Sequence, residues 1–151
     1  MGLDMYLTKR TYVRNCDSMR LDELHQVRVT RNGQPVTHIQ PERVIYIVEE
    51  VGYWWRAFAI QSWFVGNVQN GIDEGQQSYV SREKLAELLD LVNEALADES
   101  KAQKLLPTTS EFFFIPSWYQ EHYFDDLELT KEIIETALED HDGDFYYQSS
   151  W

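Results

Sequence analysis

Apolar and polar residues alternate at the start of the chain, which is the pattern of a strand with one buried face. Leu3, Met5 and Leu7 alternate with more polar residues and predict an opening strand. Residues 43–51 (RVIYIVEEV) are β-branched and aromatic and predict a second strand, whereas the polar residues 11–24 predict a loop or a short helical turn.

A hairpin is expected between these two strands. Residues 25–31 and 34–40 have strand composition and flank Asn32-Gly33, a pair that favours the positive φ angles of a tight turn. Pro35 lacks a backbone N–H, so its strand is expected at the edge of a sheet.

Further along the chain the pattern indicates helices. Residues 53–68 (YWWRAFAIQSWFVGNV) form an apolar run that is too long for a strand and predicts a helix buried on several sides. Residues 82–97 predict an amphipathic helix with Ser81 as its N-cap. A last helix is expected to begin between residues 117 and 126 and to end near Asp140.

The remaining segments complete the predicted fold. Residues 70–77 predict a loop, residues 111–115 (EFFFI) a buried strand, and residues 145–151 (FYYQSSW) a terminal strand. Together the elements predict one α+β domain over residues 1–151, with a mainly antiparallel sheet that includes both termini and about three helices packed against it.

Composition and charge narrow the class of protein. Of the 151 residues 43% are hydrophobic, which is enough to build a core and excludes a disordered chain. The net charge is −13, but residues 1–43 carry 7 basic and 5 acidic side chains, whereas residues 44–151 carry 6 and 21. No apolar run has the length of a membrane span and no secretory signal precedes the first strand, so a cytoplasmic protein is expected. The acidic balance argues against direct binding to nucleic acid.

Four stretches carry a resemblance: residues 1–7 (MGLDMYL), 53–71 (YWWRAFAIQSWFVGNVQNG), 79–85 (YVSREKL) and 145–151 (FYYQSSW). They resemble a family of small bacteriophage and prophage proteins without an assigned activity, over roughly two-thirds of the chain. The resemblance implies a phage-type accessory protein inside the host cell. Family members often carry a histidine where this chain has Gln61 and a cysteine near residues 75–76, so the resemblance implies no metal or nucleophile at those positions here.

Acidic side chains recur along the last predicted helix at spacings of three and four residues, which places them on one helix face. They are Asp125, Glu128, Glu132, Glu135, Glu139 and Asp142. A second row follows the preceding helix and consists of Glu83, Glu87, Asp90, Glu94 and Asp98. Like-charged neighbours destabilise an isolated helix by roughly 0.2–0.5 kcal/mol a pair. The rows therefore suggest a surface for a basic partner, although a solvated face of an acidic protein has the same pattern.

An aromatic cluster immediately precedes this last helix. Trp118, Tyr119 and His122 have the composition of a protein-binding hot spot or of a core. With Glu121, Asp125 and Asp126, His122 could hold a divalent ion, but no second histidine stands at ligand spacing in this segment, so we expect no metal.

A second constellation is expected on the predicted helix of residues 53–68. Arg56, Trp63 and Asn67 would fall on one strip of that helix and could hold a small anionic, nucleotide-like ligand. The alternative is that Arg56 pairs with a carboxylate while Trp63 packs into the core.

Enzyme signatures are mostly missing from the sequence, which lacks GxxxxGK[ST], GxGxxG, GxSxG and HExxH motifs. The single cysteine, Cys16, has no histidine beside it, and no catalytic residue is assigned. Two acid–base candidates remain for a hydrolase, Asp73 with Glu74 and His122 with Asp126.

These observations predict a non-enzymatic accessory protein that binds and modulates a host protein with a basic surface, either a defence protein or one that handles nucleic acid. A small-ligand binder and a hydrolase are the alternatives. No cofactor is expected, and a monomer and a homodimer both fit the sequence.

Overall fold

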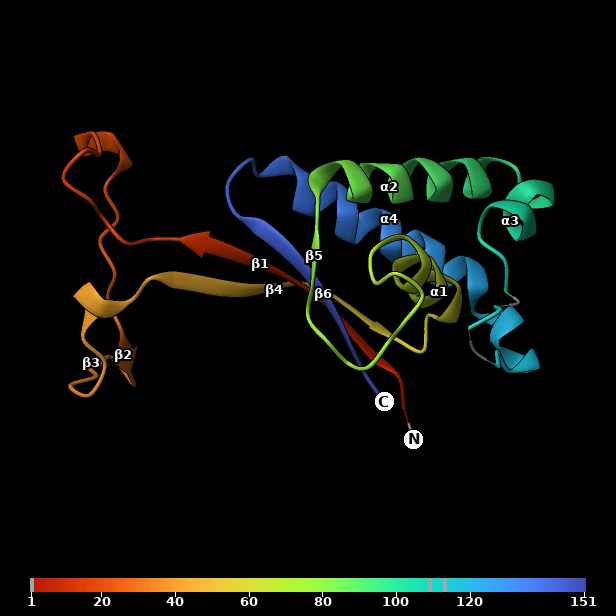
Figure 1. The fold of residues 1–151 in the computed structure, drawn as a ribbon, viewed down its shortest axis with the longest axis horizontal. Coiled ribbons are helices and arrows are strands. Elements are labelled where there is room, and N and C mark those ends of the chain that lie inside the picture. The colour runs from red at the N-terminus through yellow and green to blue at the C-terminus, as the bar shows by residue number, and fades with distance from the viewer. Residues whose placement is uncertain (1, 109, 113) are drawn as a thin grey trace.

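The central sheet of the protein contains both ends of the chain. The computed structural model describes residues 2–108, 110–112 and 114–151. Four antiparallel strands, β1 (Asp4–Tyr12), β4 (Tyr46–Trp55), β5 (Ser78–Val80) and β6 (Asp144–Ser150), lie in the order β4-β1-β6-β5 (Figure 1). The predicted α+β class, with both terminal strands in one sheet, is confirmed.

Four α-helices accompany the sheet. They are α1 (Phe58–Asn67), α2 (Arg82–Ala97), α3 (Glu99–Leu105) and α4 (Tyr123–Glu139), and a 3-10 helix, η3 (Ser117–Glu121), precedes α4. In Figure 1, α2 and α4 run side by side above the sheet. Along β1, Met5 and Leu7 are buried while Tyr6 and Thr8 are half-buried, so the helices cover one face of the sheet.

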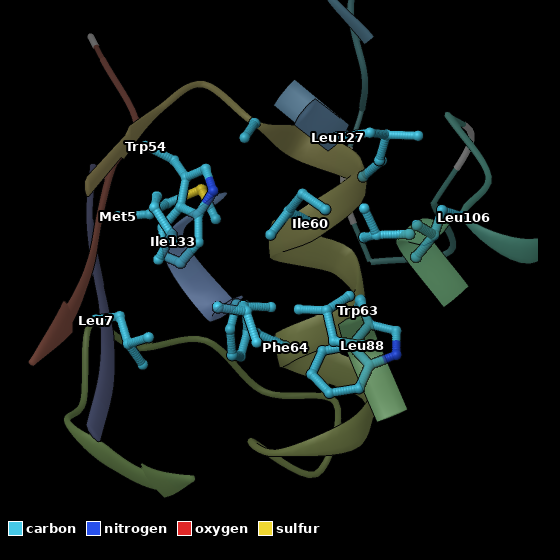
Figure 2. Packing of buried hydrophobic residues seen from close by; sticks show 14 of the residues in the cluster. Met5, Leu7, Trp54, Ile60, Trp63, Phe64, Leu88, Leu106, Leu127 and Ile133 are labelled. Atoms are coloured by element: carbon cyan, nitrogen blue, oxygen red, sulfur yellow. The ribbon is translucent and has the colours of Figure 1, made fainter. Parts of the chain in front are cut away.

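The core lies between that sheet face and the helices (Figure 2). Trp54 is fully buried, and its indole N–H donates a hydrogen bond to the Thr130 hydroxyl at 2.9 Å. The ring of Phe64 stacks on Tyr147 with centroids 4.0 Å apart. At Gly52 a Cβ atom would lie 2.5 Å from Ile133 Cγ2, so only glycine lets α4 approach β4 this closely.

The helix predicted over residues 53–68 is wrong in its first third. Tyr53 and Trp55 are exposed and Trp54 is buried, so the aromatic run continues the two-residue period of β4 instead of starting a helix. The chain then turns at Arg56, whose φ is +56°, and α1 begins at Phe58.

A projecting arm, residues 14–45, connects β1 to β4 and extends beyond the end of the sheet (Figure 1). Its elements are η1 (Leu21–Glu23), β2 (Thr30–Arg31), β3 (Gln34–Pro35) and η2 (Pro41–Arg43). The predicted turn is confirmed, with φ of 50° at Asn32 and 77° at Gly33. The flanking strands predicted over 25–31 and 34–40 shrink to two residues each, since no residue of the arm is buried and no packing extends the ladder.

The strand predicted over residues 111–115 is also wrong for the described positions, and residue 113 lies outside the described residues. Phe114 is 89% exposed, and the ring of Phe112 leans toward Gly66 and Gly71. No helix in the described parts of the chain is long and apolar enough to cross a membrane.

Candidate functional site

One side of α4 forms an uncompensated negative surface. Four exposed glutamates, Glu128, Glu132, Glu135 and Glu139, make up what we call the α4 acidic face. They line a shallow groove of about 440 Å³ together with Leu129, Lys131 and Thr136. Among the described residues none of the four takes part in an ion pair within 4.0 Å.

The second acidic row, on α2, is partly neutralised by neighbouring lysines. Lys84 lies 2.6 Å from Glu87, and Lys101 lies 3.8 Å from Glu94 and 3.9 Å from Asp98. The two rows look alike in sequence, but only the α4 acidic face lacks basic neighbours within ion-pair distance in the described chain.

A small cleft opens at the N-terminal end of α4, and we call it the α4 cleft. It has a volume of about 170 Å³ and is lined by residues from the end of β4, from η3 and from the first turn of α4: Trp55, Arg56, Trp118, Tyr119, His122, Asp125 and Asp126. The partner-binding residues predicted before α4 and the first residue of the acidic row are thus brought together.

Arg56 and two tryptophans build one side of this cleft. The Arg56 N–H donates to the Leu3 carbonyl at 2.8 Å, which holds the residue in its left-handed conformation. Its guanidinium lies 4.6 Å from the ring centroid of Trp55 and 5.7 Å from that of Trp118, within cation–π range. Trp55 is 56% and Trp118 41% exposed, so both rings also face solvent.

The Asp126 carboxyl is the unusual polar group of the α4 cleft. Its Oδ2 atom is buried and has no hydrogen-bond partner in the described structure. Burial raises the pKa of Asp126 to about 6, although the Tyr119 hydroxyl and the nearby His122 favour the charged form. A buried carboxylate oxygen without a donor is costly, so an incoming ammonium or guanidinium group would satisfy it.

His122 and Asp125 lie at the exposed rim of the cleft. His122 Nδ1 is 3.9 Å from Asp125 Oδ2, and their side chains are 63% and 84% exposed. Within the described ranges no three His, Cys, Asp or Glu side chains gather closely enough to hold a metal ion.

The alternative ligand site, Arg56 with Trp63 and Asn67, is not assembled as predicted. Arg56 lies before α1, not on it, so the assumed helical spacing does not apply. Trp63 is largely buried, and Asn67 donates to the Trp63 carbonyl at 2.9 Å. Trp63 and Asn67 line a separate cleft of about 500 Å³ with Phe112, whereas Arg56 lines the α4 cleft.

Asp73 and Glu74 do not form an acid–base pair. Burial would raise the pKa of Asp73, but hydrogen bonds from Ser149, Gly75 and Gln61 hold it below its usual value. The Ser149 hydroxyl donates at 2.5 Å and the Gln61 amide at 2.9 Å, while Glu74 is exposed. Asp73 is therefore a stable anion, and its hydrogen bonds connect the loop before β5 to α1 and β6. Because its pKa is lowered, it is also a weak base.

Three members of the α4 cleft were not predicted as partner-binding residues: Trp55, Asp126 and Arg56, of which Arg56 was assigned only to the alternative ligand site. Trp55 was assigned to a helix, because residues 53–55 are all aromatic and show no alternation of polar and apolar residues in the sequence. Asp126 was considered only for a metal or for acid–base chemistry, because its burial depends on Tyr119 and on the packing of η3.

Comparisons with protein-family models, with curated proteins and with solved structures find no match to this chain.

Proposed function

We propose that this protein is a non-enzymatic accessory protein that binds a partner protein with a basic surface through the α4 cleft and the α4 acidic face. The observation that carries the proposal is the buried, unpartnered Oδ2 of Asp126 beside two exposed tryptophans. A lysine or arginine side chain from the partner would donate to this oxygen and cover the indole rings at the same time.

The α4 acidic face extends this anchor along the helix. Its four glutamates repel one another, so a basic surface placed against them would relieve the repulsion as well as add attraction. Attraction of this kind accelerates association and weakens with salt. The same field repels phosphate groups, which favours a protein partner over nucleic acid.

The aromatic cluster supports a defined contact, not a diffuse one. Trp55 and Trp118 are large, exposed and held in place by Arg56. Tryptophan is enriched among the residues that dominate binding energy at protein interfaces. We therefore place the strongest contact at the α4 cleft and an orienting contact along the α4 acidic face.

The α4 cleft favours binding over hydrolysis. The pKa of Asp126, about 6, would suit a general acid or base. However, its unpartnered oxygen is buried beside two exposed indole rings, an arrangement that suits a bound cation. The resemblance to bacteriophage and prophage proteins suggests the setting, in which the partner is a host protein of defence or of nucleic-acid handling in the host cytoplasm.

The test removes charge from one helix at a time. Tagged protein captures partners from a host lysate, and binding of the purified partner is then measured by calorimetry. The variant Glu128→Gln/Glu132→Gln/Glu135→Gln is expected to weaken binding at least about tenfold. The matched control, Glu83→Gln/Glu87→Gln/Asp90→Gln on α2, removes the same charge and is expected to leave affinity within about twofold.

A separate variant tests the cleft. Asp126→Asn keeps the shape of the side chain and removes the charge that a cation needs, so binding should fall by at least about tenfold. Equal losses in the α2 and α4 charge variants, or full affinity in Asp126→Asn, would contradict the proposed site.

A further inference from the structure

The arm contributes nothing to the core of its own chain. Every residue of the hydrophobic core lies outside residues 14–45, and no residue within that range is buried. Ordering a segment of this length without fully burying any side chain is unfavourable, because little of the lost conformational entropy is offset. This feature is typical of a segment that binds a surface on another molecule.

Apolar side chains of the arm and of its base are open to solvent. Leu21 is 90% exposed, and Leu24, Ile39 and Ile45 are each about 40% exposed. At the base of the arm four further apolar side chains, Tyr12, Tyr46, Ile47 and Val48, are 42–55% exposed. Surfaces of this kind on an otherwise well-packed protein mark interaction sites.

The charge of the arm identifies what it fits. Of its five arginines only Arg20 forms an ion pair within the described residues, with Asp22 at 2.7 Å. The other four, Arg14, Arg28, Arg31 and Arg43, are exposed. Around the hairpin turn, residues 24–41 contain Arg28 and Arg31 and no acidic residue. The chain thus carries four arginines on the arm and four glutamates on the α4 acidic face, all without an ion-pair partner in its described parts.

These two surfaces do not meet within one molecule. The arm extends beyond the far end of the β1–β4 ribbon (Figure 1), and no ion pair joins it to α4 within the described residues. Any solution of this protein, however, contains other copies of the chain. The α4 acidic face of such a copy has the negative charge that matches the arginines of the arm.

We infer that the arm docks on a second copy of this chain, with its arginines against the α4 acidic face, and that the second copy returns the same contact. Such a reciprocal exchange is two-fold symmetric and closes after two copies. The inference rests on the proposed function, because it assigns a partner to the same acidic face. It adds that the dimer and the basic host partner compete for this face.

The experiment measures oligomeric state and does not require the host partner. Light scattering after size exclusion is expected to give a dimer at about 0.1 M salt that weakens at about 1 M salt, where charges are screened beyond roughly 3 Å. Arg28→Glu/Arg31→Glu and, separately, Glu132→Lys/Glu135→Lys should each weaken the dimer at least about tenfold. Mixing these two variants should restore a dimer, because each supplies the charge that the other lacks.

An arm-free variant provides the second measurement. The Val13 N–H donates to the Ile45 carbonyl at 2.9 Å, so Asn-Gly in place of residues 14–44 would close the ribbon as a short hairpin. This variant retains every core residue and is expected to be a folded monomer.

Three results would overturn the inference: a monomeric full-length protein throughout the concentration range, a dimer that survives removal of the arm, or no dimer from the mixed variants. Binding of the host partner is read separately. If the arm-free monomer still binds the partner and loses it on Glu128→Gln/Glu132→Gln/Glu135→Gln, the proposed function stands whatever the oligomeric state.

Discussion

The arm and the remainder of the chain, which we call the body, are connected by strands β1 and β4. They differ in whether their side chains are buried in a core. β1 and β4 enter the body with one face buried against helices, where Met5, Leu7 and Trp54 are fully enclosed. Beyond Val13 and before Tyr46 the same ribbon continues into a segment without a buried side chain. Strand composition alone therefore does not make long strands in the arm, which has neither a packed layer nor a partner strand held by one.

The largest expected effect is on the free energy of unfolding, and it compares the loss of one buried apolar side chain with the loss of one exposed apolar side chain. Trp54→Ala removes a fully buried ring and its hydrogen bond to Thr130, and should lower the free energy of unfolding by about 3–5 kcal/mol. Leu21→Ala, in the arm, should change it by less than about 0.5 kcal/mol in a monomeric background. Denaturant unfolding of both variants checks this, and a large loss for Leu21→Ala would show that the arm belongs to the folding unit.

The next effect, on the pH dependence of stability, concerns Asp126, a body residue whose Oδ2 atom has no hydrogen-bond partner in the described structure. Its pKa in the folded protein, about 6, lies above the ordinary 3.8, so the folded state is favoured below pH 4 and loses that advantage as the pH rises through 6. Asp126→Asn should therefore raise the free energy of unfolding at pH 7 by about 2 kcal/mol and have little effect below pH 4. Thermal melts across pH measure the difference.

The neighbouring Asp125→Asn is the control for that prediction. Its side chain is 84% exposed, and its replacement should shift stability by less than about 0.5 kcal/mol at any pH. A stabilised Asp126→Asn that also loses partner binding would show that the cleft sacrifices stability for function.

A third, smaller effect on stability compares a helix cap in the body with a turn glycine in the arm. The Ser81 hydroxyl accepts a hydrogen bond from the Lys84 N–H at 3.1 Å and caps α2, so Ser81→Ala should destabilise the body by about 1 kcal/mol. Gly33→Ala strains a turn with φ of 77° in the arm, but should leave the melting temperature of the body unchanged. Calorimetric melts of the two variants, run side by side, decide whether turn and body unfold together.

The smallest effect lies on the surface. Removing two like charges with Glu132→Gln/Glu135→Gln should stabilise a monomeric body by about 0.5 kcal/mol at low salt, and the gain should vanish at high salt. A loss of stability instead would mean that the α4 acidic face already interacts with basic groups.

The sequence was sufficient where local pattern and packing agree. The alternation of residues 3–7 and the strand composition of residues 145–151 identified the terminal strands, and the helical spacing of Leu85, Leu88 and Val92 identified α2. The acidic row of α4 follows directly from helical periodicity, because a helix with one buried face must expose the other.

Features that depend on tertiary packing could not be predicted from the sequence pattern. Continuous apolar residues at the β4–α1 junction do not reveal where a strand ends, because both elements are buried there. The boundary is set at Arg56, whose left-handed backbone depends on its bond to Leu3. For the candidate site, Trp118, Tyr119, His122 and Asp125 were identified as neighbours in sequence, but Trp55 and Arg56 join them only through packing between β4 and η3. The short strand β5 was missed because three residues carry too little periodicity.

The pairing of Asp4 with Ser150 has a practical consequence. Because the first and last strands run side by side and in opposite directions, a short linker could join the two ends of the chain without disturbing the sheet. Such a ring, reopened between Asn32 and Gly33, would keep every core contact while splitting the arm into two free tails. This circular permutant would fold through the same core but would lack an intact arm, so folding and binding through the arm could be measured independently.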